Sequence, residues 1–425
     1  MVDGAMRWRY LGLAERLTQF RKTNQMSAAP LARLAGISLR TYYLLESGKV
    51  QPSMETLERL SIAMKIDPGW LGFGVSANGL APHIAFTPGF DSEALVKDLL
   101  AQLRGPSGVI DDVYKYLDST GAHEWRTLLQ QPEFANVVAA LPMGSVLECL
   151  IGKVERDDGV DVIGLGCGDG EREISLIKKL LARRIRNLRL LLLDISVSLL
   201  GAAVQASDQF SRAHSVPVMA LLGNFHNLPE YAHLLTGDHP RRRVITMFGY
   251  TFSNLDNEVQ FLRRSMRWAN PGDILVLDLP AAATDSTDPS EIRRRDKSFT
   301  KRSGGEWHSA AFRFLTGPLR RNLDRISDIK IKTELDQTSC VIPGSYAVMH
   351  TADVRLQSGE SKHFVIGYSK RYDLAKLASH MDTEGWTLLE GHPYGQDSFG
   401  LVAIFQRQEP KPKRLPILIS SQGST

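Results

Sequence analysis

The residues best placed to do chemistry form a glycine-rich loop. Residues 161–170 read DVIGLGCGDG, and a helical pattern follows at 171–184. Such glycines let a chain turn sharply after a strand and let a ligand approach the backbone at a helix N-terminus. The dinucleotide pattern GxGxxG is absent, because Asp169 and Glu171 occupy its sixth positions. Acidic residues beside the loop favour a cationic sulfonium over a pyrophosphate, so we predict S-adenosylmethionine (SAM) rather than NAD as the ligand.

Two further strand ends carry residues that suit this ligand. The run LLLLDIS places Asp194 at the end of an apolar strand, where a carboxylate can accept both ribose hydroxyls. Asn224 follows the next apolar run, and its amide could read the adenine edge. The alternative is a structural glycine-rich turn with a capping aspartate. The predicted cofactor residues are Gly164, Gly166, Gly168, Asp194, Asn224 and Phe225.

The elements that must position these residues alternate between apolar runs and amphipathic helical stretches. This β-α-β alternation predicts an α/β fold with a doubly wound parallel sheet. The predicted strands are 160–165, 188–193, 216–221, 244–248 and 274–279, with later strands at 364–368 and 399–406 around a helix at 374–384. No element is assigned to the charged, Gly/Ser-interrupted stretch up to about residue 340.

Length and composition limit how the chain can be organised. At 425 residues it exceeds the roughly 250–300 residues that a single hydrophobic core usually contains, so two or more domains are expected. A content of 43% hydrophobic and 23% charged residues excludes wholesale disorder. No apolar run reaches the roughly 18 residues of a membrane helix, and no leader pattern is present, so we expect a cytoplasmic protein. The predicted parts are 1–74, a linker at 75–105 with one helical patch at 92–103, a sheet domain at 106–280, a cap subdomain at 281–408 and a tail at 409–425.

The first 74 residues resemble the XRE/λ-repressor-like helix-turn-helix family. The matching features are a helix with Leu31-Ala32, a turn at Gly36, Ser38 opening the recognition helix, Glu46-x-Gly48, Pro52, and Leu57 with Leu60. The resemblance implies an all-α, five-helix domain that binds DNA. Helices are expected from 13 to about 24, from 28 to 35, at 39–46, at 54–66 and from 67.

The charge distribution agrees with a DNA-binding first part. Residues 1–74 hold ten Lys/Arg and six Asp/Glu, whereas the remainder has 41 of each sign. The recognition helix would place Ser38, Arg40, Thr41 and Tyr43 against DNA, with Lys49 at phosphate. Because Ala28 replaces a phosphate-binding glutamine common in the family, a dimerisation or docking module is the alternative. Arginine clusters at 183–189, 241–243, 293–295 and 320–325 are interpreted as solvated faces and domain contacts rather than as a nucleic-acid track.

Residues from about 110 to 406 resemble the histidine-specific SAM-dependent methyltransferases of ergothioneine synthesis. The most specific match is VITMFGYTFSN at 244–254, followed by Phe261-Leu262-Arg263 and Pro271-Gly272-Asp273. Weaker matches are KYLD at 115–118 with Gly121, PEF at 132–134 and YSKRY at 368–372. The resemblance implies a Rossmann-like class I methyltransferase with an α+β substrate subdomain, and SAM as cofactor.

The same resemblance implies an altered acceptor pocket. Asn254 matches the asparagine that holds the acceptor's amino acid moiety, and Ser369 matches the family serine. The two family tyrosines fall on Leu117 and Phe134, and the glutamate that meets imidazole falls on Gly367. A pocket that loses its polar partners loses discrimination for a polar substrate. We therefore predict that the acceptor is an amine or amino-acid-like metabolite other than histidine, or something larger.

Methyl transfer from a sulfonium needs alignment more than acid–base chemistry, because the donor is already activated. Tyr250 and Asp278 are the candidate catalytic residues that position or deprotonate the acceptor. The histidines at 226, 233 and 239 lack metal-site spacing, so no metal is predicted. The expected assembly is a homodimer.

Two other functions remain open at this point. A degenerate methyltransferase fold could sense SAM or a related metabolite and move the DNA-binding heads of a dimer. Alternatively, DNA, RNA or protein could itself be the methyl acceptor, with the N-terminal domain as the docking arm.

Overall fold

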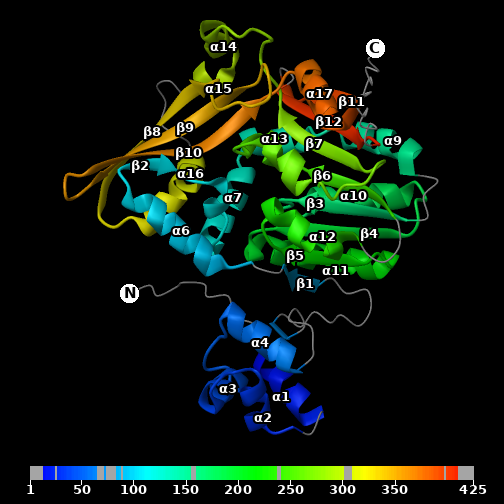
Figure 1. Cartoon of the computed structure of the whole chain (residues 1–425), viewed down its shortest axis with the longest axis vertical. Helices are drawn as coiled ribbons and strands as arrows, with labels where there is room; N and C mark the ends of the chain where they lie inside the picture. Colours follow the sequence, from blue (N-terminus) through cyan, green and yellow to red (C-terminus); the bar gives the residue numbers. More distant parts are fainter. Residues whose placement is uncertain are drawn as a thin grey trace, which may run out of the picture.

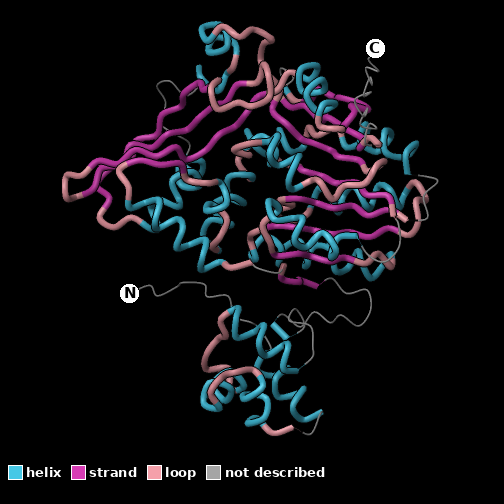
Figure 2. Tube along the Cα trace, viewed as in Figure 1, coloured by secondary structure: helices cyan, strands magenta, loops and turns pink. Residues whose placement is uncertain are grey.

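The computed structural model describes residues 13–23, 26–64, 71–72, 83–87, 90–154, 159–236, 241–300, 309–396 and 399–409 (Figures 1 and 2). Within this part, the N-terminal domain contains α1 (Leu13–Thr23), α2 (Ala28–Leu34), α3 (Leu39–Glu46) and α4 (Met54–Met64). The predicted fifth helix, from residue 67, lies outside the described residues except for a helical pair at 71–72.

The N-terminal helices pack around an apolar core that includes Leu17, Leu31, Tyr42, Leu45, Leu57 and Leu60. Gly36 has a φ of +63°, a conformation that suits glycine at the turn between α2 and α3. Ser38 opens α3, and its hydroxyl accepts a hydrogen bond from the Thr41 N–H at 3.0 Å. This cap confirms the predicted start of the recognition helix.

The main sheet of the larger part has eight strands in the order β1-β5-β4-β3-β6-β7-β12-β11. Its strands are β1 (His83–Phe86), β3 (Val160–Leu165), β4 (Leu188–Asp194), β5 (Val218–Leu222), β6 (Arg242–Met247), β7 (Ile274–Pro280), β11 (Trp386–Tyr394) and β12 (Gly400–Arg407). Strand β12 runs antiparallel to both of its neighbours, and the other pairings are parallel. The strand order reverses at β3, which places a ligand crevice at the carboxyl ends of the strands.

Helices cover both faces of this sheet, as its nearly all-apolar inner strands require. One apolar cluster joins the sheet to α9 (Met143–Val154), α10 (Glu171–Ala182) and α11 (Val197–His214). The other joins it to α12 (Leu228–Thr236), η4 (Phe261–Ser265) and α17 (Leu374–Thr383). Short segments η2 (Phe225–Asn227), η3 (Thr251–Asn254) and α13 (Glu258–Gln260) follow strand ends.

A second sheet of four strands has the order β2-β10-β9-β8. These are β2 (Ser107–Val109), β8 (Ile326–Asp336), β9 (Tyr346–Leu356) and β10 (Ser361–Arg371). Its apolar face packs against α6 (Ser92–Arg104), η1 (Asp112–Lys115) and α16 (Ser309–Asn322). The remaining helices are α7 (Ser119–Leu129), α8 (Pro132–Ala139), α14 (Pro289–Arg295) and α15 (Lys297–Thr300). No strand was predicted at β8, where apolar and charged residues alternate, or at β9, where most residues are buried.

The segment predicted as a linker, 75–105, contributes ordered structure. Strand β1 pairs in parallel with β5, and α6 packs on the second sheet. Thr87, just after β1, donates both its N–H and its hydroxyl to the Leu222 carbonyl, each at 3.0 Å. Helix α6 confirms the helical patch predicted at 92–103. Strand β1 was not predicted, because it has only four residues and too little apolar sequence to be recognised.

Several arginines of the predicted clusters form ion pairs within the chain. Arg189 and Arg241 both pair with the buried Asp161, each at 2.5 Å, and Arg243 pairs with Asp273 at 2.8 Å. These partners agree with domain contacts rather than a nucleic-acid track. In the described part of the chain, no helix has the length and apolar character needed to cross a membrane.

Candidate active site

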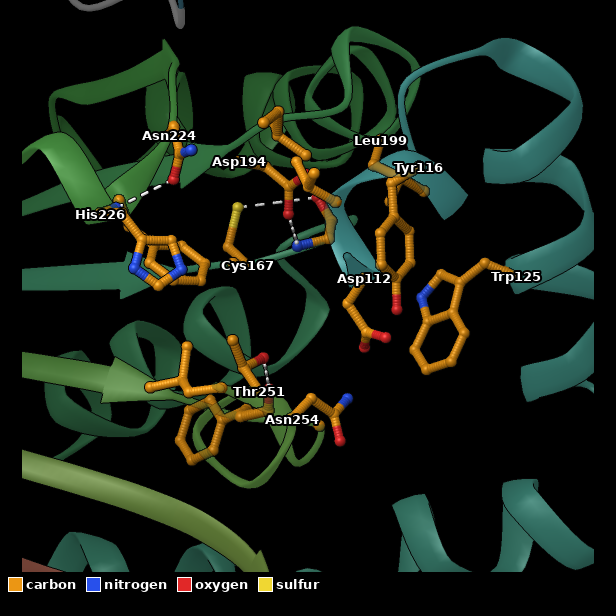
Figure 3. Close-up of a pocket in the computed structure, with 18 of the residues that line it drawn as sticks. Asp112, Tyr116, Trp125, Cys167, Asp194, Leu199, Asn224, His226, Thr251 and Asn254 are labelled. Atoms are coloured by element: carbon orange, nitrogen blue, oxygen red, sulfur yellow. Dashed lines mark hydrogen bonds between the residues drawn. The ribbon is translucent and has the colours of Figure 1, made fainter. Parts of the chain in front are cut away.

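A cavity of about 880 Å³ lies at the carboxyl ends of β3, β4, β5 and β6 (Figure 3). One wall consists of the loops after these strands and includes Gly166, Gly168, Asp194, Asn224, Phe225 and Asn254. The opposite wall comes from η1, α7 and α8 and includes Asp112, Tyr116, Trp125 and Ala135. Six of the predicted site residues therefore meet around one space of the size that ligand pockets have.

The glycine loop needs its glycines for conformation and for space. Gly166, Gly168 and Gly170 have φ values of +65°, +59° and +70°. A Cβ at Gly166 would lie 2.9 Å from Thr251 Cγ2 and 3.4 Å from Phe225 Cε1. The N–H groups of Gly166 and Cys167 donate to the Leu193 carbonyl, so the loop is tied to β4. What it presents to a ligand is a bare backbone surface at the start of α10.

Asp194 lies at the end of β4 and lines the cavity. Its two carboxylate oxygens accept hydrogen bonds from the N–H groups of Gly168 and Ser196, each at 2.8 Å. Each oxygen keeps further lone pairs for the hydroxyls of a ribose. Burial raises the pKa of the Asp194 carboxyl, and the two backbone hydrogen bonds oppose that shift. The position is thus a pre-oriented acceptor beside the glycine loop.

The loop after β5 forms the next part of the same wall. The Asn224 side-chain oxygen accepts the His226 N–H at 3.0 Å, which leaves the amide NH₂ as the donor available to an adenine nitrogen. The Phe225 ring packs edge-on against Phe261, with centroids 5.8 Å apart. His226 also lines the cavity, and burial lowers the pKa of its imidazole. The pair Asn224 and Phe225 fits a flat heterocycle.

Gly164 acts indirectly, since it does not line the cavity. A Cβ there would lie 2.9 Å from Glu173 Cγ, so this glycine makes room for the Glu173 side chain. Glu173 does line the cavity, and its Oε1 accepts the Thr246 hydroxyl at 2.9 Å. Burial raises the pKa of Glu173 to about 7. Sequence reasoning missed this glutamate, although it follows the glycine loop directly.

Asp112 lines the cavity together with Asn254. Lys115 donates to the Asp112 carboxylate, and the Asn254 amide also hydrogen-bonds with it. Burial raises the pKa of Asp112, whereas Lys115 and Asn254 oppose that shift. The Lys115 side chain is 3% exposed and the Asp112 side chain 22%. The carboxylate is therefore held by two partners and still open to the cavity.

Aromatic rings flank this carboxylate. The Tyr116 and Trp125 rings meet edge to face with centroids 5.8 Å apart, and Phe314 packs behind both at 5.3 and 5.2 Å. Burial raises the pKa of the Tyr116 hydroxyl well above its usual range. Tyr116 thus stays a neutral hydroxyl, and the cavity wall here is apolar except for polar groups at its edge.

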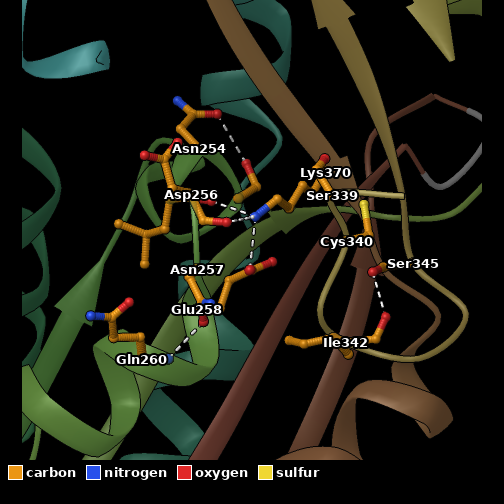
Figure 4. Close-up of polar contacts among 12 residues, drawn as sticks. Asn254, Asp256, Asn257, Glu258, Gln260, Ser339, Cys340, Ile342, Ser345 and Lys370 are labelled. Atoms are coloured by element: carbon orange, nitrogen blue, oxygen red, sulfur yellow. Dashed lines mark hydrogen bonds and ion pairs between the residues drawn. The ribbon is translucent and has the colours of Figure 1, made fainter. Parts of the chain in front are cut away.

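Asn254 is held in place from the second sheet (Figure 4). The loop after it receives Lys370 of β10, whose ammonium donates to the carbonyls of Leu255 and Asp256 and to Glu258 Oε2 at 2.8 Å. The Lys370 and Glu258 side chains are at most 1% exposed. This buried ion pair joins the second sheet to the loop that carries Asn254.

The two predicted catalytic residues do not line the cavity. Asp278 is buried at the end of β7, where its carboxylate accepts the Gly249 N–H at 2.9 Å and the Tyr394 hydroxyl. Tyr250 has a φ of +66°, and its hydroxyl lies 3.5 Å from that of Tyr394. This network shapes the 249–254 turn and gives both side chains partners within the protein. A role of Tyr250 and Asp278 at the acceptor stays a prediction.

Four predicted acceptor residues also lie outside the cavity lining. Leu117 packs into the core beneath the second sheet, and Phe134 packs against the aromatic cluster. Ser369 accepts a hydrogen bond from Arg371 at 2.6 Å. A Cβ at Gly367 would lie 3.0 Å from Lys115 Nζ, so the lysine occupies the space next to that glycine.

The acceptor wall includes residues that were not predicted. Tyr116, the neighbour of Leu117, lines the cavity and brings a hydroxyl to this wall. Asp112 and Trp125 were missed altogether. The sequence held a weak signal for them, because aromatic and acidic residues recur between 111 and 125.

On the N-terminal domain, the predicted DNA-contacting residues differ in exposure. Ser38, Arg40, Tyr43 and Lys49 are exposed, with 53% of the Tyr43 surface accessible to solvent, whereas Thr41 is half-buried. Ser38 and Thr41 hydrogen-bond to each other through their hydroxyls at 2.7 Å. Tyr42 is fully buried in the domain core. Tyr43, the next residue along α3, faces outward.

A doubly wound sheet whose glycine loop and strand-end carboxylate border one cavity is the arrangement of Rossmann-like nucleotide-binding enzymes. Residues 95–287 match the family described as histidine-specific, SAM-dependent methyltransferases, and residues 17–71 match a helix-turn-helix family. The chain is therefore a SAM-dependent methyltransferase with an N-terminal helix-turn-helix domain. A comparison with curated protein sequences gives no match.

Solved structures give distant matches. One is a SAM-dependent methyltransferase from Clostridium acetobutylicum ATCC 824, at 10% identity and a TM-score of 0.37, with 68% of this chain and 99% of that chain covered. Another is the magnesium protoporphyrin IX methyltransferase from Synechocystis PCC 6803 with bound S-adenosylhomocysteine, at 12% identity and a TM-score of 0.40, with coverages of 70% and 98%. At these values the matches carry no information on the acceptor.

Proposed function

We propose that the chain transfers the methyl group of SAM to the nitrogen of an amine or amino-acid-like acceptor other than histidine. The observation that carries this proposal is the single continuous cavity. The glycine loop and Asp194 lie at one end, and Asp112 with Asn254 lie at the other. The absence of a side chain at Gly367, together with Lys115 beside it, supports an acceptor other than histidine.

The chemistry asks the chain to align two reactants. The nitrogen lone pair attacks the methyl carbon while the carbon–sulfur bond breaks and its electrons pass to sulfur. The products are S-adenosylhomocysteine and a methylated ammonium, so the positive charge moves from sulfur to nitrogen. Asp194 and the glycine loop would fix the donor, and Asn254 would orient the acceptor. Such alignment in a site that excludes water supplies much of the rate enhancement.

Label transfer from [methyl-³H]SAM tests this function. The full chain should transfer label to at least one member of an amine panel and should methylate histidine at least ten times more slowly. Tight SAM binding without methyl transfer to any amine, metabolite extract or macromolecule would contradict an enzymatic function and would support a SAM sensor. Label on DNA, RNA or protein would identify a macromolecular acceptor instead.

We further propose that the helix-turn-helix domain binds DNA through Ser38, Arg40, Thr41, Tyr43 and Lys49. The exposure of Arg40, Tyr43 and Lys49 supports this assignment. Fluorescence anisotropy with duplex DNA should show binding that weakens steeply with salt. Arg40→Ala should reduce sequence preference, whereas Lys49→Ala should weaken binding to all sequences alike. No binding at low salt would favour a docking module.

We also propose a cytoplasmic homodimer. Light scattering on the purified chain should give about twice the 47.2 kDa of one chain, and a single-chain mass would contradict the proposal.

A further inference from the structure

The acceptor end of the cavity holds a fixed, partly open carboxylate. Lys115 lies beneath Asp112 and does not line the cavity, so it orients the carboxylate without covering it. In Figure 3 the Asp112 carboxylate points into the space between the Trp125 ring and Asn254. An N–H group entering this space from the cavity would meet an acceptor oxygen whose position is already set.

The neighbouring rings suit a cation or an apolar group. The Tyr116 and Trp125 rings line the same part of the cavity, and their edge-to-face contact fixes both. Aromatic ring faces attract ammonium groups, most strongly where water is excluded. Lys115 donates to Asp112 and is buried, so its charge is already paired with that carboxylate. The combination of one carboxylate and two rings is complementary to an amine on an apolar group.

We propose that Asp112, Tyr116 and Trp125 form the subsite that selects the acceptor, and that this acceptor is an amine attached to an aromatic or aliphatic group. Its nitrogen hydrogen-bonds to Asp112, and its apolar group lies against the two rings. This inference rests on the proposed function, because it names the class of molecule that the same site methylates.

The direction of charge movement gives the subsite a catalytic consequence. During the transfer, positive charge is lost from sulfur and develops on the acceptor nitrogen. A carboxylate and ring faces beside that nitrogen therefore stabilise the transition state more than the ground state. Asp112 therefore acts as a binding residue for the acceptor, and its removal should lower the transfer rate as well as the affinity for amines.

Matched probes test the subsite without knowledge of the natural acceptor. Calorimetry on the full chain saturated with S-adenosylhomocysteine compares phenethylamine with 2-phenylethanol, and hexylamine with 1-hexanol. We expect at least one amine to bind about tenfold or more tightly than its alcohol, as one charge-assisted hydrogen bond implies. Equal affinities in both pairs would overturn the subsite.

Substitutions then assign the preference to named residues. Asp112→Asn keeps the shape and removes the charge, and it should abolish the amine preference while S-adenosylhomocysteine affinity stays within twofold. Tyr116→Phe retains the ring and should retain the preference, whereas Trp125→Leu should weaken both members of the phenethylamine pair. Asp98→Asn, on the exposed face of α6, controls for net charge and should change nothing.

The possible outcomes distinguish a failure of the proposed subsite from a failure of the proposed methyltransferase function. An amine preference that survives Asp112→Asn, or a loss of SAM affinity without a loss of S-adenosylhomocysteine affinity, would overturn the subsite; the latter would place Asp112 at the sulfonium. Failure of the wild-type chain to bind SAM, or SAM binding with no transfer to any acceptor, would instead contradict the proposed function.

Discussion

The two ends of the cavity are built in different ways. The donor end comes from the ends of β3, β4 and β5, neighbours in one sheet whose loops are tied by backbone hydrogen bonds such as Gly168 to Asp194. The acceptor end combines η1 and α7 with η3, and the latter is held by Lys370 from the second sheet. The proposed donor site is therefore built from one sheet, whereas the proposed acceptor site depends on contacts between distant segments.

Removing Asp194 should break the donor end alone. Asp194→Ala deletes the acceptor for two ribose hydroxyls, each hydrogen bond to a charged group being worth about 1.5–3 kcal/mol. We expect SAM affinity in calorimetry to fall by roughly a hundredfold or more. Asp98→Ala, an exposed change on α6 outside the cavity lining, should leave SAM affinity unchanged. An Asp194→Ala variant that still binds SAM normally would refute the assignment.

Lys370→Met should damage the acceptor end and spare the donor end. It leaves Glu258 buried without its ion-pair partner, and such a loss costs about 3–5 kcal/mol. Urea unfolding should show this loss, and label transfer should fall while SAM affinity in the folded protein stays the same. The double variant Lys370→Met/Glu258→Leu should recover most of the stability. A matching fall in SAM affinity would show that the two ends are not independent.

The pH dependence of stability sharpens the description of the donor end. The pKa of Glu173 is about 7 in the fold and roughly 4.3 in an unfolded chain. Because the pKa is higher in the folded state, the contribution of Glu173 to the free energy of unfolding is fully present below about pH 4. This contribution is lost as the pH rises to about 7. Glu173→Gln should therefore lack a decline of about 2–3 kcal/mol that wild type shows between pH 5 and pH 8. Parallel urea curves for both proteins at the two pH values provide the measurement.

Gly121→Ala should disturb the acceptor end of the cavity, with a smaller effect than the Asp194 and Lys370 substitutions. A Cβ at Gly121 would lie 1.9 Å from the Lys115 carbonyl oxygen, so η1 must move with its Asp112 and Lys115 side chains. Overpacking of this kind costs about 1–3 kcal/mol. Methyl transfer should fall with no change in SAM affinity. Gly152→Ala in α9 is the matched control, because its Cβ would meet nothing within 4 Å.

Much of the main sheet and the donor end could be predicted from the sequence. Each of the five predicted central strands begins within two residues of its observed start, because buried parallel strands are continuous apolar runs. The donor residues follow those strands directly, so local pattern places them. Strand β8 was missed although Ile329, Ile331 and Leu335 alternate with exposed charged residues, which is the pattern of a half-buried strand.

The acceptor end could not be predicted to the same degree. A shift of one residue separates Tyr116 from Leu117, yet one lines the cavity and the other enters the core. The direction of a side chain after a short 3₁₀ turn depends on what packs against it. Here that is Phe314 of α16, which lies far along the chain. Asp278 is a similar case. Its place at a strand end suggests a catalytic role, but its carboxylate accepts a hydrogen bond from Tyr394, a residue far along the chain that local sequence does not reveal.

The short strand β1 has a consequence for dividing the protein into fragments. A polypeptide that begins at residue 90 would contain every residue that lines the cavity, yet it would leave β5 with a bare edge of unpaired backbone groups. Uncovered edges of this kind promote association between sheets of different molecules. A polypeptide that begins before residue 83 keeps that edge capped. The shortest fragment that avoids such association and stays active is thus determined by the pairing of β1 with β5 and not by which residues line the cavity.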